Sequence, residues 1–184
     1  MELLQGRLLI ASSRLVDPNF FRSIVLLVQH SEEDGALGLI LNRPLKMTVR
    51  SAWAQISQSP CQTDGFLYQG GPCEGPLMAL HTVEEFSQHQ VLPGLFFSTE
   101  KESVEELVGA AEGWRQFFIG YAGWTAGQLE SEIKEGGWLT SATTLQQVQE
   151  GNDEKWNLLR KLATRSAAFP WIDPATFPTD PSNN

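Results

Sequence analysis

The chain has 184 residues and an apolar fraction of 41%, which is enough for one domain with its own hydrophobic core. Its formal net charge of −9 argues against direct nucleic-acid binding, because phosphate contacts rely on clustered Lys and Arg. Two cysteines without metal-ligand spacing, no basic leader and no long apolar run lead us to expect a cytoplasmic protein with reduced thiols, no metal, no cofactor and no membrane association.

The first third of the sequence predicts strands joined by tight turns. Alternating apolar residues predict a strand at residues 3–11, and a continuous aliphatic run predicts a buried strand at residues 23–30. Turn-forming residues 31–35 join the second strand to a returning strand at residues 36–42, so these two form a hairpin. Pro44 ends the returning strand, because proline holds the residue before it in an extended conformation.

One helix and several short strands are predicted next. Apolar residues at helical spacing predict a helix at residues 48–57. Its buried face would carry Val49, Ala52, Trp53 and Ile56. The short strands are predicted at residues 66–69, 77–81 and 94–98. The segment between the first two, rich in Gly and Pro, is predicted to be a bend, and His89 is predicted to lie in a loop.

Three later helices are predicted to begin at a Thr followed three positions on by Glu or Gln, the capping-box pattern. The pairs are Thr99 with Glu102, Thr125 with Gln128, and Thr144 with Gln147. Asn152 is a suitable cap for a last helix, and the proline-rich residues 169–184 predict a loosely attached extension. Hairpins followed by mixed strands and helices favour one α+β domain over residues 1–168 rather than a doubly wound sheet.

The segment 120–130, Gly-Tyr-Ala-Gly-Trp-Thr-Ala-Gly-Gln-Leu-Glu, is the most distinctive part of the chain. It follows a strand-like run at residues 116–119 and precedes a helix-like run, so it predicts a tight joint at which backbones approach closely. Free amides at a helix start can also bind an anion. The segment lacks both the GxxxxGK[ST] and the GxGxxG patterns, and so it has no phosphate-loop signature.

Several motifs occur together in the order typical of one bacterial family. They are Asp17 to Ser23, His30, Gly38 to Pro44, Gly70-Gly71-Pro72, Gly120 to Glu130, Trp138 and Trp156. In these motifs the chain resembles the AlgH/YqgE family over roughly Gly6 to Leu162. The resemblance implies a mostly antiparallel sheet that bends into a pseudo-barrel with flanking helices. It also brings the label of transcriptional regulator, which rests on the genetics of some members, and no established catalytic residue.

Polar residues at strand ends suggest a pocket. Asn42 and Arg43 can fork around a carboxylate or phosphate; alternatively, Asn42 bonds the turn backbone and Arg43 pairs with an acid such as Asp17. Tyr121 and Trp124 can line a site or simply pack the core. The expected pocket gathers Arg22, His30, Asn42, Arg43, Gly70, Gly71, Tyr121 and Trp124. We interpret the chain as a non-enzymatic protein that binds a small anionic ligand or a protein partner, and that affects gene expression indirectly if at all.

An enzyme of unassigned, hydrolase-like class is the alternative interpretation. His30 or His81 would act as acid or base, with Asn42 and Arg43 polarising and clamping the substrate. Cys73 would need a nearby histidine to become a nucleophile, and the neighbouring Glu74 would raise its pKa, so a small buried apolar role fits better.

Overall fold

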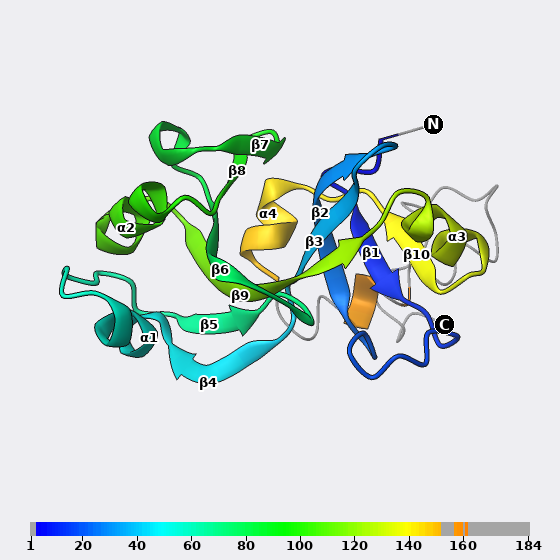
Figure 1. Ribbon diagram of the computed structural model, residues 1–184, viewed down its shortest axis with the longest axis horizontal. Helices are drawn as coiled ribbons and strands as arrows, with labels where there is room; N and C mark the ends of the chain where they lie inside the picture. Colours follow the sequence, from blue (N-terminus) through cyan, green and yellow to red (C-terminus); the bar gives the residue numbers. More distant parts are fainter. Residues whose placement is uncertain (1–2, 152–156, 160, 162–184) are drawn as a thin grey trace, which may run out of the picture.

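Ten strands form one bent, mostly antiparallel sheet with helices at its flanks (Figure 1). The computed structural model describes residues 3–151, 157–159 and 161, so the predicted cap Asn152 and the predicted extension at residues 169–184 lie outside the described residues. The strand order is β10-β1-β2-β3-β9-β6-β8-β7, while β4 pairs with β5, and β5 pairs in parallel with β9. The α+β prediction is confirmed.

The strands are β1 (Leu8–Ala11), β2 (Ile24–Ser31), β3 (Gly35–Ile40), β4 (Pro44–Thr48), β5 (Phe66–Gln69), β6 (Cys73–His81), β7 (His89–Leu92), β8 (Leu95–Ser98), β9 (Arg115–Trp124) and β10 (Trp138–Ser141). The helices are α1 (Val49–Ile56), the short 3-10 helix η1 (Glu84–Phe86), α2 (Lys101–Gly109), α3 (Gln128–Lys134) and α4 (Leu145–Gln149). None of the helices in the described ranges combines the length and the apolar character needed to cross a membrane.

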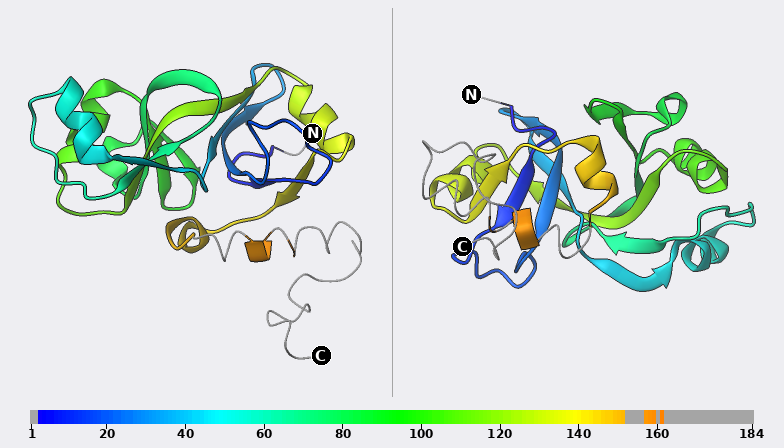
Figure 2. Two further views of the ribbon diagram at one scale, coloured as in Figure 1. Left: turned by 90° about the horizontal axis from the view of Figure 1, so that it is seen from below. Right: turned by 180° about the vertical axis from the view of Figure 1, so that it is seen from behind.

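Strand β9 runs through the middle of the molecule and joins its two halves (Figures 1 and 2). Its first five residues pair with β6 and β5, and residues 122–124 pair with β3. Gly120 lies at the change of partner with a φ of 69°. The predicted joint is therefore misplaced: the strand does not end at residue 119 but continues to Trp124, because β3 provides it with a second pairing edge.

Three glycines allow the chain to cross itself at this point. Gly70 donates its N–H to the carbonyl of Ile119 and accepts from the N–H of Ile40, which ties β9 to β3. A Cβ on Gly71 would overlap the backbone of Tyr121, and a Cβ on Gly120 would lie 2.7 Å from the carbonyl oxygen of Gly71. The crossing therefore excludes side chains at these positions.

The sheet bends until its β7 edge contacts β2, but these two strands do not pair, and so the sheet does not close into a barrel. His89 donates from Nε2 to the carbonyl of Val28 at 2.8 Å, and its Nδ1 lies 3.2 Å from the side-chain amide of Gln29. The bend encloses a core that includes Leu26, Leu80 and Phe118. The predicted pseudo-barrel is confirmed as a bent, open sheet; the loop predicted at His89 is wrong, because residues 89–92 pair with β8.

Most of the remaining differences between prediction and structure arise where contacts with residues distant in the chain determine the local structure. Gln88 accepts hydrogen bonds from the N–H groups of Thr99 and Glu100, and so α2 begins at Lys101 without the predicted capping box. The box at Thr144 is confirmed, and Gln128 accepts from Thr125 although α3 is capped by Gly127. Pro44 ends one strand as predicted, but it also begins β4.

Candidate functional site

A cavity of about 630 Å³ opens where the β2–β3 turn meets the end of β9. We call it the Tyr121 pocket. Its lining comes from the N-terminal segment, both strands of the hairpin, the start of β6, the end of β9 and the start of α3. The side chains in this lining include those of Gln5, Gln29, His30, Asp34, Cys73, Tyr121, Trp124 and Gln128. Three of the eight predicted site residues therefore meet here: His30, Tyr121 and Trp124.

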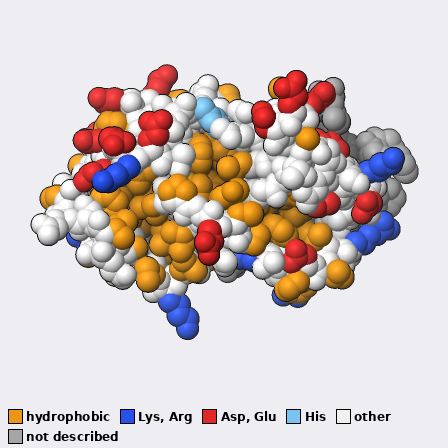
Figure 3. Space-filling view, viewed as in Figure 1, with side chains coloured by type: hydrophobic (Ala, Val, Ile, Leu, Met, Phe, Trp, Pro, Cys, Tyr) orange, Lys and Arg blue, Asp and Glu red, His pale blue; other side chains and the backbone are white. Residues whose placement is uncertain are grey.

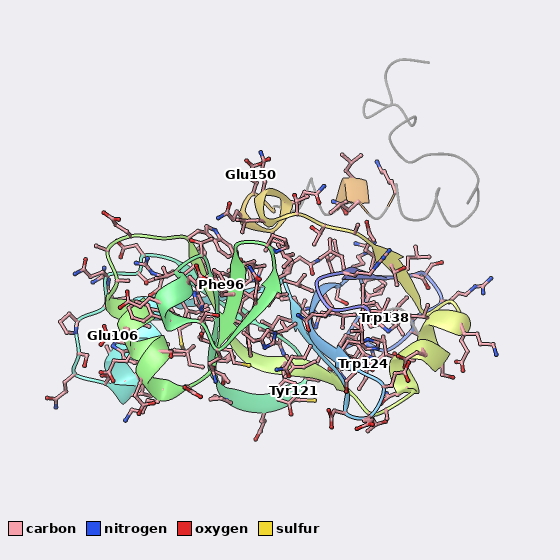
Figure 4. The ribbon with its side chains drawn as sticks, turned by 90° about the horizontal axis from the view of Figure 1, so that it is seen from above. Phe96, Glu106, Tyr121, Trp124, Trp138 and Glu150 are labelled. Atoms are coloured by element: carbon pink, nitrogen blue, oxygen red, sulfur yellow. The ribbon has the colours of Figure 1, made fainter. Side chains whose placement is uncertain are left out.

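Tyr121 lies at the surface of this pocket, at the edge of the molecule in Figure 4. A Cβ on Gly75 would lie 3.2 Å from its ring, and a Cβ on Gly123 would also lie 3.2 Å from it. The ring therefore rests on sheet backbone that two glycines keep clear. In the described part of the chain no group hydrogen-bonds to its hydroxyl, which leaves a flat aromatic surface and a polar group for a ligand.

His30, on β2, connects two walls of the pocket, the N-terminal segment and α3. Its Nδ1 accepts from the backbone N–H of Leu4 at 3.1 Å, and its Nε2 lies 2.7 Å from Oε1 of Glu130 in α3. Because Nδ1 is an acceptor, the ring carries its proton on Nε2 and donates it to Glu130. Both ring nitrogens are thus occupied, and the side chain is 1% exposed. This arrangement suits a structural tie and leaves no nitrogen free to act as a general base.

The Glu130 carboxylate keeps its charge in this arrangement. Burial raises its pKa, but hydrogen bonds from its own backbone N–H and from the His30 ring outweigh burial and leave the pKa below its ordinary value. Glu130 therefore remains an acceptor for His30 at neutral pH.

Trp124 forms the inner wall of the pocket, and a second carboxylate, that of Glu132, holds its indole in place. The indole N–H groups of Trp124 and Trp138 both donate to Oε2 of Glu132, at 3.0 and 2.8 Å, and Gln128 donates to Oε1. The two indoles meet edge to face at 5.9 Å, and Phe20 packs against both (Figure 4). One glutamate thus satisfies two buried donors and fixes the wall.

Glu132→Ala is expected to lower the free energy of unfolding by about 2 kcal/mol, because it leaves both indole N–H groups without a partner. Glu135→Ala, directly after the end of the same helix, removes an exposed carboxylate and should change stability by about 0.5 kcal/mol or less. Urea unfolding of the two variants checks this difference. Equal losses in both would show that the indole bonds contribute nothing specific.

Asn42 and Arg43, the pair predicted to bind an anion, do not line the Tyr121 pocket. Asn42 accepts from the N–H of Ile24 at 2.9 Å and donates to the carbonyl of Arg22, and Arg43 donates to the carbonyl of Phe21. Ile24 begins β2 and His30 lies near its other end, roughly 20 Å away at the rise of a strand. Arg22, Asn42 and Arg43 therefore stabilise the turn before β2, where Arg22 has a φ of 57°.

The electrostatics of Arg43 fit this structural role. Burial lowers the pKa of its guanidinium, and the charge of Asp17 partly opposes that effect. The structural interpretation of Asn42 as a turn-bonding amide agrees with these contacts. Gly70 and Gly71 serve the backbone crossing at Gly120 and do not line the Tyr121 pocket.

His81 is not placed for catalysis either. Its side chain is fully buried in the other half of the molecule, where Nε2 lies 2.9 Å from Oγ of Ser98. Because that hydroxyl donates its proton to the carbonyl of Phe86, Nε2 is the donor to Ser98. Burial lowers its pKa to about 4, against a smaller opposing effect of the Val83 backbone. Cys73 lines the Tyr121 pocket, half-buried, and the part of the chain that the structure describes contains no cluster of three metal-ligating side chains.

Comparison with known proteins assigns the chain to a family. The family model described as AlgH-like matches residues 8–166, which is most of the chain. The chain belongs to the AlgH-like family. A UPF0301 protein of Chlorobaculum tepidum is 39% identical over 78% of the chain and 77% of its own length, and one of Streptomyces avermitilis is 35% identical over 98% and 95%.

Solved structures of the family agree. The solution structure of AlgH from Pseudomonas aeruginosa superposes with a TM-score of 0.71 at 26% identity, covering 93% of this chain and 90% of that one. The crystal structure of a Corynebacterium diphtheriae protein gives a TM-score of 0.67 at 24% identity, with 88% of each chain covered, and supports the fold alone. The names of these relatives and solved structures state no activity.

Proposed function

We propose that the chain is a non-enzymatic binding protein whose ligand occupies the Tyr121 pocket. The observation that carries this proposal is a large cavity with a half-buried aromatic ring and fixed walls, beside a histidine whose two nitrogens are already used. A binding site needs such a preorganised, partly apolar surface with a few polar groups. An acid–base catalyst would need a free nitrogen that His30 does not offer.

The polar groups of the pocket offer more acceptor sites than donors. Gln5 and Gln29 each use one of their two amide N–H groups, on the carbonyl of Gln90 and on His89, which leaves both carbonyl oxygens and one N–H of each for a ligand. Asp34 adds a carboxylate, and the described residues that line the pocket include neither Lys nor Arg. This lining opposes the anionic ligand expected from the sequence. It fits a planar, uncharged or cationic ligand with N–H donors, such as an amino-substituted heterocycle.

An effect on gene expression would then be indirect. A chain with a net charge of −9 lacks the charge for a broad phosphate contact surface, so a regulatory signal would pass through the ligand or a partner protein.

A thermal-shift screen of aminopurines and aminopyrimidines, with planar carboxylates such as benzoate as the matched negative set, tests this function. A ligand present at 100 times its Kd adds about 2.7 kcal/mol of stability, which raises the Tm by about 5–10 °C for a chain of this size. Tyr121→Leu should remove the shift. Phe66→Leu, which changes an exposed aromatic residue outside the pocket, should retain it. A shift that survives Tyr121→Leu would contradict the proposal.

A further inference from the structure

A second concave surface lies in the other half of the molecule, between α1 and α2 (Figure 1). It measures about 300 Å³. We call it the α1–α2 groove. Trp53 and Ile56 of α1 form one wall, Val104 and Glu105 of α2 form the other, and Pro76 and Leu77 at the start of β6 form the floor. Figure 3 shows hydrophobic side chains gathered on this face of the molecule.

Ile56 is the clearest sign that this groove lacks a partner within the chain. Its spacing with Val49 and Trp53 predicts that it shares their buried face, and those two residues are buried. Ile56 is nevertheless 69% exposed. α1 ends at this residue, and the core that packs against Val49, Ala52 and Trp53 does not include it. Ile119, paired with Leu77 across the sheet, is also 40% exposed.

The wall formed by α2 is acidic. Glu105 lines the groove, and Glu102 lies one turn before it on the same side of the helix. Glu100 and Glu106 are exposed close by, and Lys101, the one lysine of this helix, lines the groove beside Glu105, so acidic side chains outnumber it on this side. Within the described ranges the side chains of Glu100, Glu102 and Glu106 have no ion-pair partner. Figure 3 shows a red cluster of acidic side chains above the apolar face.

We infer that the α1–α2 groove is a docking surface for a basic amphipathic helix of a partner protein. The flanking helices have eight and nine residues, about 12–14 Å, which matches two turns of an incoming helix. Apolar side chains three or four positions apart on that helix would cover Ile56, Pro76 and Leu77. Lysine or arginine along its edge would meet the unpaired carboxylates of α2, which gives the contact its charge selectivity.

Fluorescence polarisation with two labelled 14-residue peptides tests this inference. Both carry leucine at helical spacing; one carries lysine and the other glutamate at the remaining positions. The lysine peptide should bind the wild-type chain and the glutamate peptide should not. Ile56→Asp should weaken binding of the lysine peptide at least tenfold. Glu102→Lys combined with Glu106→Lys should weaken it severalfold.

Matched controls separate groove binding from general attraction to an acidic protein. Phe21→Asp alters an equally exposed apolar residue in the other half of the molecule and should leave binding unchanged. Tyr121→Leu should also leave it unchanged, so this result stands apart from the ligand screen. All the substituted positions except Tyr121 are exposed, and circular dichroism checks the fold of each variant. Equal binding to Ile56→Asp and wild type, equal binding of the two peptides, or no binding to wild type would overturn the inference.

Discussion

Gly71→Ala is expected to lower the free energy of unfolding by about 3 kcal/mol, a larger loss than the one expected for Glu132→Ala. An alanine Cβ would overlap the carbonyl carbon of Tyr121 and the nitrogen of Ala122. Those atoms belong to β9, which is held on both sides by β6 and β3, so they cannot move away without loss of pairing. Urea unfolding measures the loss.

Gly65→Ala provides the matched control. A Cβ on Gly65 would meet nothing within 4 Å, and so this variant should stay within about 1 kcal/mol of wild type. If the two alanine variants were equally stable, the close crossing of residues 70–71 over β9 would be contradicted.

His81→Gln is expected to change how stability depends on pH. In the unfolded chain His81 takes up a proton near its ordinary pKa of 6.5, whereas burial lowers its folded pKa to about 4. The unfolded state therefore binds more protons between these values, and wild type loses stability as the pH falls from 6.5 to 4. The loss is about 3 kcal/mol from this one residue.

Glutamine preserves a donor for Ser98 and does not titrate, so the variant escapes this loss. Its stability relative to wild type should improve by about 3 kcal/mol between pH 7.5 and pH 4, measured by urea unfolding at both pH values. The comparison with wild type cancels the titration of the other groups. Parallel pH profiles for the two proteins would rule out a neutral, buried His81.

The elements that the sequence predicted well rest on local signals. The β2–β3 hairpin follows from an aliphatic run, a turn and a second run, and α1 spans Val49–Ile56 within the predicted residues 48–57, with Thr48 as its cap. Three strands were missed for physical reasons. Strand β10 has only four residues, and it forms by pairing with the distant β1. Strand β4 is an exposed edge that begins with proline, and β7 has four residues of mixed polarity whose pairing depends on the distant β8.

The site was predicted only in part. His30, Tyr121 and Trp124 meet because β3 brings the hairpin turn to the end of β9. The separation of Asn42 from His30 follows from the hairpin itself: a turn at residues 31–35 places residue 42 opposite the start of β2, not its end. The role of Glu130 had no local signal, because its partner His30 lies 100 positions away in the chain. Glu132 lies only eight and six positions from Trp124 and Trp138, but no sequence motif marks a carboxylate shared by two indoles.

The central claim is that the Tyr121 pocket binds a planar ligand rich in N–H donors. Titration of the ¹⁵N-labelled chain with 2,6-diaminopurine, followed by the other aminopurines and aminopyrimidines, tests it most directly. We predict saturable chemical-shift changes at the amides of Gly123 and Thr125 and at the indole N–H of Trp124. The absence of a shift throughout the series, or shifts centred on Asn42 and Arg43 instead, would contradict it.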